Sequence, residues 1–231
     1  MGNVLQTFGD YDTALKLYQA QLDIARFLQD KVEMGRALGN IGQIYSSAGF
    51  HEQAIKYHQQ NLMLAKESND KATECVVHGN LAIAHQAIGM YEIALVHYHS
   101  HLNLARESKS SSEEKNALFN FGIFYSVRGD FSSALVFFEN FLMMSQEWND
   151  IVGEAKGCHL LGYTHFCLGN YREAVRYYNQ ELALEKSHVD NKCQAFCNLS
   201  LAHLSLNNLD EAMKYGEKFL SKFLYLLLLK L

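Results

Sequence analysis

Apolar side chains recur at every third or fourth position along most of the chain, which is the spacing of one face of an amphipathic helix. In residues 34–48 they stand at Leu38, Ile41 and Ile44, and residues 51–68 repeat the pattern after a glycine. The two stretches therefore predict a pair of helices joined by a short turn.

This helix pair recurs along the chain with a period of 40 residues, which shortens to 38 before the last copy. An alanine followed by an aliphatic residue marks each copy: Ala14, Ala54, Ala94, Ala134, Ala174 and Ala212. A turn-forming residue stands five positions earlier: Gly9, Gly49, Gly89, Gly129, Gly169 and Asn207. Glycine and asparagine adopt most readily the left-handed conformation that ends a helix. We therefore predict an all-α fold from residue 10 to residue 220, with eleven helices in antiparallel pairs and turns at these six positions.

A second set of positions predicts where the helix pairs begin. Residues with N-capping side chains recur every 40 residues, at Asp30, Asp70, Ser110, Asp150 and Asp190. Glu33 and Glu113 follow three residues after Asp30 and Ser110, a spacing that predicts capping boxes.

The first helix of each pair carries a small residue that lets the second helix approach closely, at Gly42, Ala82, Gly122, Gly162 and Ser200. The order Leu38, Gly42, Tyr45, Gly49, Ala54, His58 resembles the tetratricopeptide repeat pattern. The resemblance covers roughly residues 1–220 and implies a right-handed superhelical solenoid with a concave groove. The 40-residue form is similar to the repeats of the LGN/Pins spindle-orientation adaptors. That similarity implies a cytoplasmic protein of the cell cycle, associated with the spindle or cytoskeleton.

The two ends of the chain depart from the repeat. Met1–Phe8 holds only the last part of a first helix, and residues 221–231 are an apolar tail that matches no other copy. We predict one array over residues 1–220, with about five full repeats after a truncated first one, and a tail that extends the last helix. Since solenoids need polar caps, weak self-association through the uncapped ends and the tail is expected. A tail of this length is too short to span a bilayer.

Composition narrows the class of partner. The 231 residues include no proline, which agrees with helix following helix, and they carry a net charge of −5 without a block of like charges. Nucleic acid is therefore not expected as a partner, because phosphate binding needs clustered cations. The five cysteines form no C-x-x-C pair, which favours a reducing, cytosolic compartment.

Candidate catalytic and metal chemistry is weak. His97 and His101 share one helix face, but position 97 aligns with the aromatic residues Tyr57, Phe137 and Tyr177, which indicates packing. No phosphate loop, nucleophile elbow or zinc-protease motif occurs in the sequence. We therefore predict no enzyme activity, no cofactor and no metal.

One polar column does not follow from packing. Two residues before the small position of the first helix stand Asn40, Asn80, Asn120 and Asn198, with Leu160 as the exception. In tetratricopeptide arrays this position faces the concave groove, so the resemblance implies that the four asparagines bind a peptide backbone. Flanking groove positions add Arg36, Gln43, Lys156 and Tyr163. The alternative is that the asparagines tie neighbouring helices together by side-chain hydrogen bonds.

The sequence thus predicts a non-catalytic scaffold that binds a peptide segment of a partner protein in its groove. Two alternatives stay open: an architectural repeat element that associates with itself, and a repeat fragment of a larger multidomain protein.

Overall fold

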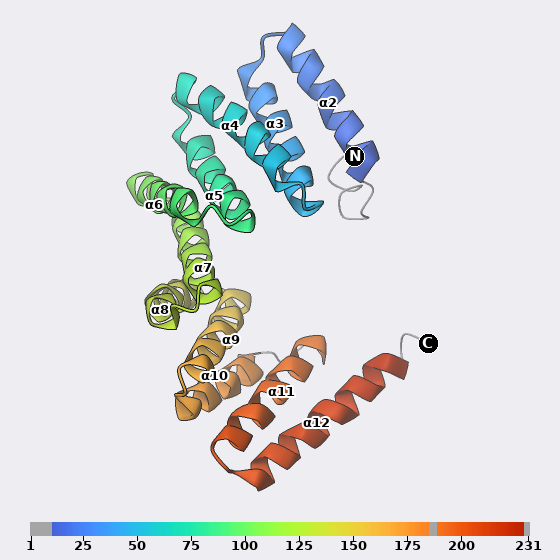
Figure 1. Cartoon of the computed structure of the whole chain (residues 1–231), viewed down its shortest axis with the longest axis vertical. Helices are drawn as coiled ribbons and strands as arrows, with labels where there is room; N and C mark the ends of the chain where they lie inside the picture. Colours follow the sequence, from blue (N-terminus) through green and yellow to red (C-terminus); the bar gives the residue numbers. More distant parts are fainter. Residues whose placement is uncertain (1–10, 185–188, 229–231) are drawn as a thin grey trace. The chain divides into compact units, whose positions relative to one another are not determined.

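The computed structural model describes residues 11–184 and 189–228, which form eleven helices and no strand (Figure 1). The helices are α2 (Tyr11–Phe27), α3 (Lys31–Ser47), α4 (His51–Glu67), α5 (Lys71–Ala87), α6 (Tyr91–Glu107), α7 (Ser111–Val127), α8 (Phe131–Glu147), α9 (Ile151–Cys167), α10 (Tyr171–Leu184), α11 (Val189–Ser205) and α12 (Leu209–Leu228). The predicted all-α fold of sequential helix pairs is confirmed. The predicted turn at Gly9 and the partial helix Met1–Phe8 lie outside the described residues.

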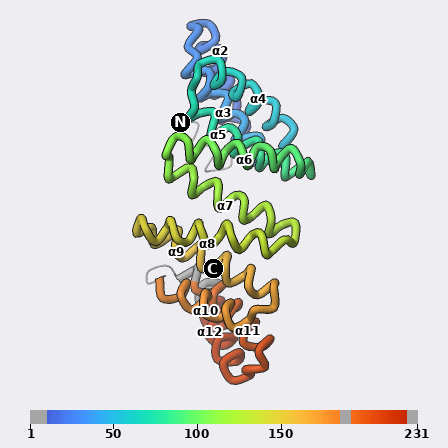
Figure 2. The backbone as a smooth tube through the Cα atoms, turned by 90° about the vertical axis from the view of Figure 1, so that its left-hand side faces the viewer, coloured from blue at the N-terminus to red at the C-terminus, as the bar shows by residue number. Residues whose placement is uncertain are grey.

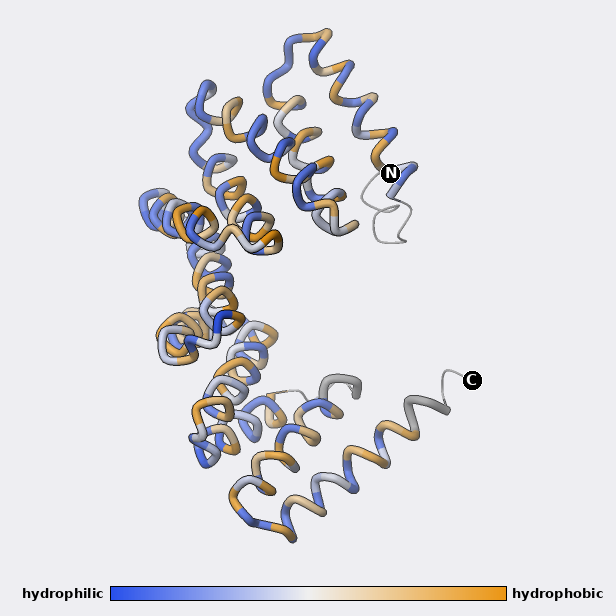
Figure 3. The backbone as a smooth tube through the Cα atoms, viewed as in Figure 1, coloured by the Kyte–Doolittle hydropathy of each residue, from blue (hydrophilic) through white to orange (hydrophobic). Residues whose placement is uncertain are grey.

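The chain divides into two compact units, one up to Asn120 and one from Phe121 onward. The first unit holds α2–α6 and the start of α7, and the second holds the rest of α7 and α8–α12. Inside each unit a helix packs against the one that follows it in sequence, a path that Figure 2 traces along the tube. Hydrophobic and hydrophilic residues are mixed along each helix, which is typical of amphipathic helices (Figure 3). None of the described helices has the length and apolar character needed to cross a membrane.

The turn inside each helix pair has the predicted left-handed residue. Gly49, Gly89, Gly129 and Gly169 have φ between +77° and +82°, and Asn207 has φ of +59°. The prediction of these five turns is confirmed, including the replacement of glycine by asparagine in the last copy.

The turns between helix pairs are also left-handed, but at residues other than glycine. The residues are Gln29, Asn69, Lys109 and Asn149, with φ of +53° or +54°. Where an aspartate follows the left-handed residue, it bonds to both of the helices that the turn connects. The Asp30 N–H donates to the Ala25 carbonyl at the end of α2 (2.9 Å), and its carboxylate accepts from the Val32 and Glu33 N–H groups at the start of α3. Asp70 and Asp150 cap α5 and α9 in the same way, which confirms these N-cap predictions.

Two other sets of predictions are wrong. The predicted capping boxes at Asp30 and Ser110 do not form, because the N–H groups that Glu33 and Glu113 would accept from are already bonded to the carbonyls of Ala25 and Ala105. The Glu33 carboxylate instead accepts from Gln21. The N-cap prediction for Asp190 is also wrong. Because the period shortens to 38 here, α11 begins at Val189, and Asp190 lies inside its first turn.

A pair of stacked rings joins the two helices of each repeat. The pairs are Tyr45–Tyr57, His85–His97, Tyr125–Phe137, His165–Tyr177 and His203–Tyr215, with centroids 5.4–5.6 Å apart and interplanar angles of 6–16°. The interpretation of His85, His165 and His203 as packing residues is confirmed, as is that of His97.

One turn away from each stacked pair, the small residue of the first helix allows another ring from the second helix to lie against the backbone of the first. A Cβ at Gly42 would come within 2.9 Å of three atoms of the His58 ring, and Gly162 stands in the same relation to Tyr178. The last repeat reverses the sizes, with Ser200 on α11 facing Gly216 on α12.

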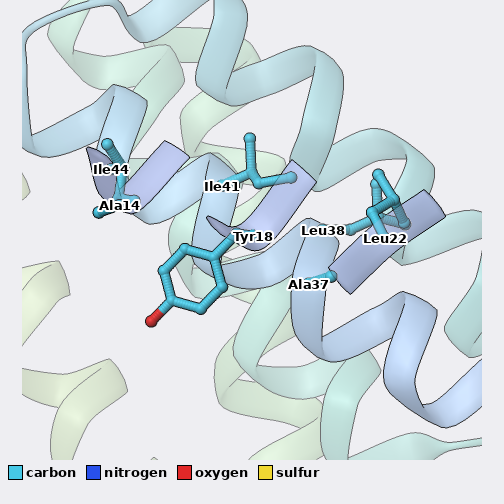
Figure 4. Packing of buried hydrophobic residues seen from close by; sticks show 7 residues of the cluster. All are labelled: Ala14, Tyr18, Leu22, Ala37, Leu38, Ile41 and Ile44. Atoms are coloured by element: carbon cyan, nitrogen blue, oxygen red, sulfur yellow. The ribbon is translucent and has the colours of Figure 1, made fainter. Parts of the chain in front are cut away.

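Aliphatic side chains complete the core between these ring contacts. Figure 4 shows such a cluster between α2 and α3, made of Ala14, Tyr18, Leu22, Ala37, Leu38, Ile41 and Ile44. All seven side chains are buried, so this part of the core joins the first complete repeat to the helix that precedes it.

Replacement of Gly122 by alanine tests the close approach. The added Cβ would lie 2.8 Å or less from three atoms of the Phe138 ring. We expect Gly122→Ala to lower the free energy of unfolding by about 1–2 kcal/mol, because overpacking outweighs the gain in helix propensity. Gly216→Ala is the matched control: its Cβ would meet only Ser200 Oγ, at 3.4 Å, so it should stabilise the chain. Urea titrations that give the two variants the same sign would contradict the packing assignment.

Burial of His58 makes stability depend on pH. Its side chain is fully buried, neither ring nitrogen has a hydrogen-bond partner, and burial lowers its pKa to about 4. The unfolded chain takes up this proton near pH 6.5 and the folded chain does so only near pH 4, so stability falls as the pH drops through this window. His58→Phe, which places there the residue type of Phe138 in a later repeat, should flatten that part of the curve. Melting temperatures of the two chains that stay parallel from pH 7 to 4 would contradict this account.

Candidate functional site

The asparagine column occupies one position on four of the first helices of the repeats. Asn40 lies on α3, Asn80 on α5, Asn120 on α7 and Asn198 on α11, and all four are half-buried. Their amide groups form no hydrogen bond with the described part of the chain. The donors and acceptors of these side chains are therefore not used to join the described helices.

Two of the asparagines line one hollow in the first unit. This hollow, which we call the α3–α5 hollow, has a volume of about 520 Å³ and is bounded by α3, the C-terminal half of α4 and α5. Asn40 and Asn80 line it together with Arg36 and Gln43. The structure thus brings four of the eight sequence-predicted site residues to one surface.

The other four predicted residues do not line this hollow. Asn120 is the last residue of the first unit, and Lys156, Tyr163 and Asn198 belong to the second. Lys156 is exposed, and partial desolvation of its ammonium group lowers its pKa. Tyr163 is 46% exposed, and a hydrogen bond with Cys167 is the main cause of its raised pKa.

Cations at the hollow already have acidic partners. The Arg36 guanidinium pairs with the Glu33 carboxylate, and Lys31 Nζ lies 3.3 Å from a Glu67 carboxylate oxygen. Both pairs are solvent-exposed, so each contributes at most about 1 kcal/mol and exchanges readily for another carboxylate. Apolar walls come from Val32, Leu64 and Val76. The hollow therefore offers amide groups, exchangeable cations and apolar surface together.

Sequence analysis missed a second column, on the second helix of each repeat. Its members are Gln21, Asn61, His101, Phe141 and Glu181, and all but Gln21 are buried. Gln21 Nε2 donates to Glu33 (2.9 Å), His101 Nε2 lies 3.1 Å from a Glu113 oxygen, and a Glu181 carboxylate oxygen lies 3.1 Å from His159 Nδ1. The 40-residue spacing of its polar members was the available signal. These contacts form a polar seam between neighbouring helices.

One member of this seam also meets a cysteine. Cys75, His101 and Glu113 offer ligand atoms within 4.8 Å of one another, a grouping that a metal ion can use. A metal on His101 Nε2 would move the proton to Nδ1, which is buried without a hydrogen-bond partner. Metal-bound histidines almost always donate that second N–H to an acceptor. The arrangement therefore favours a hydrogen bond from His101 to Glu113, which lowers the pKa of Glu113, over a metal.

Family comparisons identify the repeats. Residues 1–67, 155–188 and 194–221 match tetratricopeptide repeat families, and residues 83–153 match the family described as anaphase-promoting complex subunit 5. No curated protein sequence matches the chain. The chain therefore contains tetratricopeptide repeats, as its period predicted.

Solved structures with the same arrangement of helices share little sequence with this chain. BtubC (BKLC) from P. vanneervenii has a TM-score of 0.83 and 14% identity, over 94% of this chain and 92% of that one. Aspartyl phosphate phosphatase F from Bacillus subtilis has a TM-score of 0.76 and 15% identity, over 96% and 68%. NprR in complex with its cognate peptide NprX has a TM-score of 0.60 and 19% identity, over 95% and 64%. At these identities the likeness shows the fold alone.

The reading of Cys75, His101 and Glu113 as a hydrogen-bonded group predicts the response to zinc. We expect added Zn²⁺ to leave the melting temperature of the chain unchanged, because a bound ion would stabilise the folded state. The Cys75→Ala variant should melt at a lower temperature than the parent chain, and added Zn²⁺ should leave that melting temperature unchanged too. A zinc-dependent rise in the parent chain that Cys75→Ala abolishes would identify a metal site instead.

Proposed function

We propose that this tetratricopeptide-repeat chain is a non-catalytic scaffold that binds a peptide segment of a partner protein along its asparagine column. The observation that carries the proposal is the α3–α5 hollow, where Asn40, Asn80, Arg36 and Gln43 meet around apolar walls.

The chemistry of these groups suits an extended peptide. A carboxamide both donates and accepts, so it can pair with the N–H and C=O groups of a peptide backbone whatever its sequence. Asn40 and Asn80 have both functions available, because neither amide is bonded within the described residues. The neighbouring Arg36 can exchange Glu33 for an acidic side chain of the ligand. A peptide with one or two acidic residues and a few apolar anchors therefore fits the hollow.

Relatives in fold support the proposal by analogy. NprR is named as binding a cognate peptide, NprX, and its fold is shared with this chain. Another relative is named as a phosphatase, yet its 15% identity carries no catalytic residue over to this chain. We therefore retain the non-catalytic scaffold as the proposed function.

We further propose a role in cell division, at the spindle or cytoskeleton of the cytoplasm. The 40-residue repeats resemble LGN/Pins adaptors and, more closely, the long array of tetratricopeptide repeat protein twenty-eight. The match of residues 83–153 to anaphase-promoting complex subunit 5 points to the same process. We treat residues 1–220 as one repeat array and residues 221–231 as an extension of α12, which runs to Leu228.

A second candidate function is self-association through the end helices. Leu17 and Ile24 on α2 and Leu28 in the turn that follows are exposed and border an apolar hollow of about 340 Å³. On α12, Leu220 and Phe223 are exposed. Light scattering over a concentration series separates the candidates, because assembly through these ends would raise the apparent mass with concentration while a monomeric scaffold would not.

The double variant Asn40→Ala, Asn80→Ala tests the proposed binding surface. A peptide recovered from a random display library on the parent chain should bind this variant about tenfold more weakly, since each lost hydrogen bond costs about 0.5–1.5 kcal/mol. The melting temperature should not change, because the described helices do not use these amides. Asn103→Ala, at an exposed position on α6, is the control and should bind as the parent does. Normal affinity with a much lower melting temperature would assign the column to helix packing instead.

A further inference from the structure

Asn61 is the polar member of the second column whose side chain has no hydrogen-bond partner among the described residues. The side chain is 4% exposed, and its Oδ1 atom is buried without a hydrogen bond. A buried amide oxygen without a donor destabilises a fold, so its presence calls for a reason other than packing.

The equivalent positions show why Asn61 is the exception. Gln21 and His101 each bond the carboxylate twelve residues later, at Glu33 and Glu113. The residue twelve after Asn61 is Thr73, and its hydroxyl donates to Asp70 (2.7 Å) instead.

In the repeat formed by α9 and α10, the column residue Glu181 pairs with a residue on the preceding helix. Glu181 reaches His159, twenty-two residues earlier on α9. The residue in that relation to Asn61 is Gly39, which has no side chain to offer. Neither route used elsewhere in the chain is therefore open to Asn61.

On the α3 side the Asn61 amide lies against glycine backbone and not against side chains. A Cβ at Gly35 would lie 3.2 Å from Asn61 Oδ1, and one at Gly39 would lie 3.3 Å from Nδ2. All three residues line the α3–α5 hollow, together with Ala65 and Val77. The amide thus forms a polar end to a slot whose sides are glycine backbone and small apolar groups.

We propose that this slot takes the side-chain carboxamide of a glutamine or asparagine in the bound peptide. Such a group donates one N–H to Asn61 Oδ1 and accepts from Nδ2 with its own oxygen, which satisfies both sides of the buried amide. A lysine or arginine would bring a charge beside Ala65 and Val77, and the Asp70 carboxylate at the hollow already accepts from the N–H and hydroxyl of Thr73. The inference rests on the proposed peptide-binding function and adds a specificity pocket to it.

The experiment uses the full chain as bait for a display library of short random peptides. The parent chain is expected to enrich peptides that share a glutamine or asparagine at one aligned position. In calorimetric titrations, replacement of that residue by glutamate or leucine should weaken binding to the parent chain about tenfold.

Variants of the slot then test whether Asn61 causes the preference. Asn61→Leu should bind the glutamine and leucine peptides equally and should melt at or above the parent temperature, since it removes a buried oxygen without a partner. Gly35→Ala, which keeps the asparagine and places a methyl group against Oδ1, should also lose the preference and serves if Asn61→Leu fails to fold. The double variant Asn40→Ala, Asn80→Ala is the control, because it should weaken every peptide while keeping the preference for glutamine.

The outcomes separate this inference from the function on which it rests. Peptides that bind with no preference for a carboxamide, or with a preference for a cation, would overturn the slot while the scaffold function stands. A preference that survives in both Asn61→Leu and Gly35→Ala would do the same. A parent chain that enriches no peptide would overturn both proposals.

Discussion

The fold depends on one contact between the two helices of each repeat: a ring from the second helix lies against backbone that a small residue leaves bare on the first. Gly42 under His58 and Gly162 under Tyr178 are two instances, and Ser200 facing Gly216 keeps the approach close with the sizes reversed. Because the helices meet at this distance, the stacked ring pairs one turn away fall into register at almost identical spacing in five repeats. Histidine substitutes for tyrosine in these stacks since the contact needs a flat ring and not a phenol. Burial lowers the pKa of His85, His97 and His165, so these stacks lose stability in acid.

The short connections between repeats impose a second constraint. The Asp30 N–H bonds to the end of one helix and its carboxylate caps the start of the next. The N–H is therefore not available for a reciprocal capping contact with Glu33. Glu33 is thereby released to meet Gln21, and Glu113 meets His101 in the same way. The Gln21–Glu33 and His101–Glu113 contacts between repeats are thus a consequence of how tightly the turns are built.

Much of the fold follows from the sequence because the repeat presents each constraint several times. Gly49 and its equivalents, Asn207 and the capping aspartates all recur in register, and each has a direct mechanical cause. The register of α11 was missed because one shortened period moves Asp190 from the cap into the helix. The left-handed residues Gln29 and Lys109 were missed because neither residue type favours that conformation, and closure of a short turn imposes it. The site was predictable in part: Asn40 and Asn80 stand out by type and spacing. Asn61 does not stand out in the sequence, because what sets it apart is that its side chain lacks a hydrogen-bond partner, and only the packed structure shows this.

The repeats also explain why the α3–α5 hollow forms where it does while the asparagine column extends further. Each first helix carries two positions that face the seam, and these are Gly35 and Gly39 on α3 but Cys75 and Gly79 on α5. On α5 the His101 ring lies over Gly79, and on α9 His159 fills the second position by reaching Glu181. Where both positions are glycine, the Asn61 amide lies against glycine backbone instead of against a side chain. The proposed recognition site thus arises where two side chains are missing from the first helix of one repeat, while the ring contacts between its helices are kept.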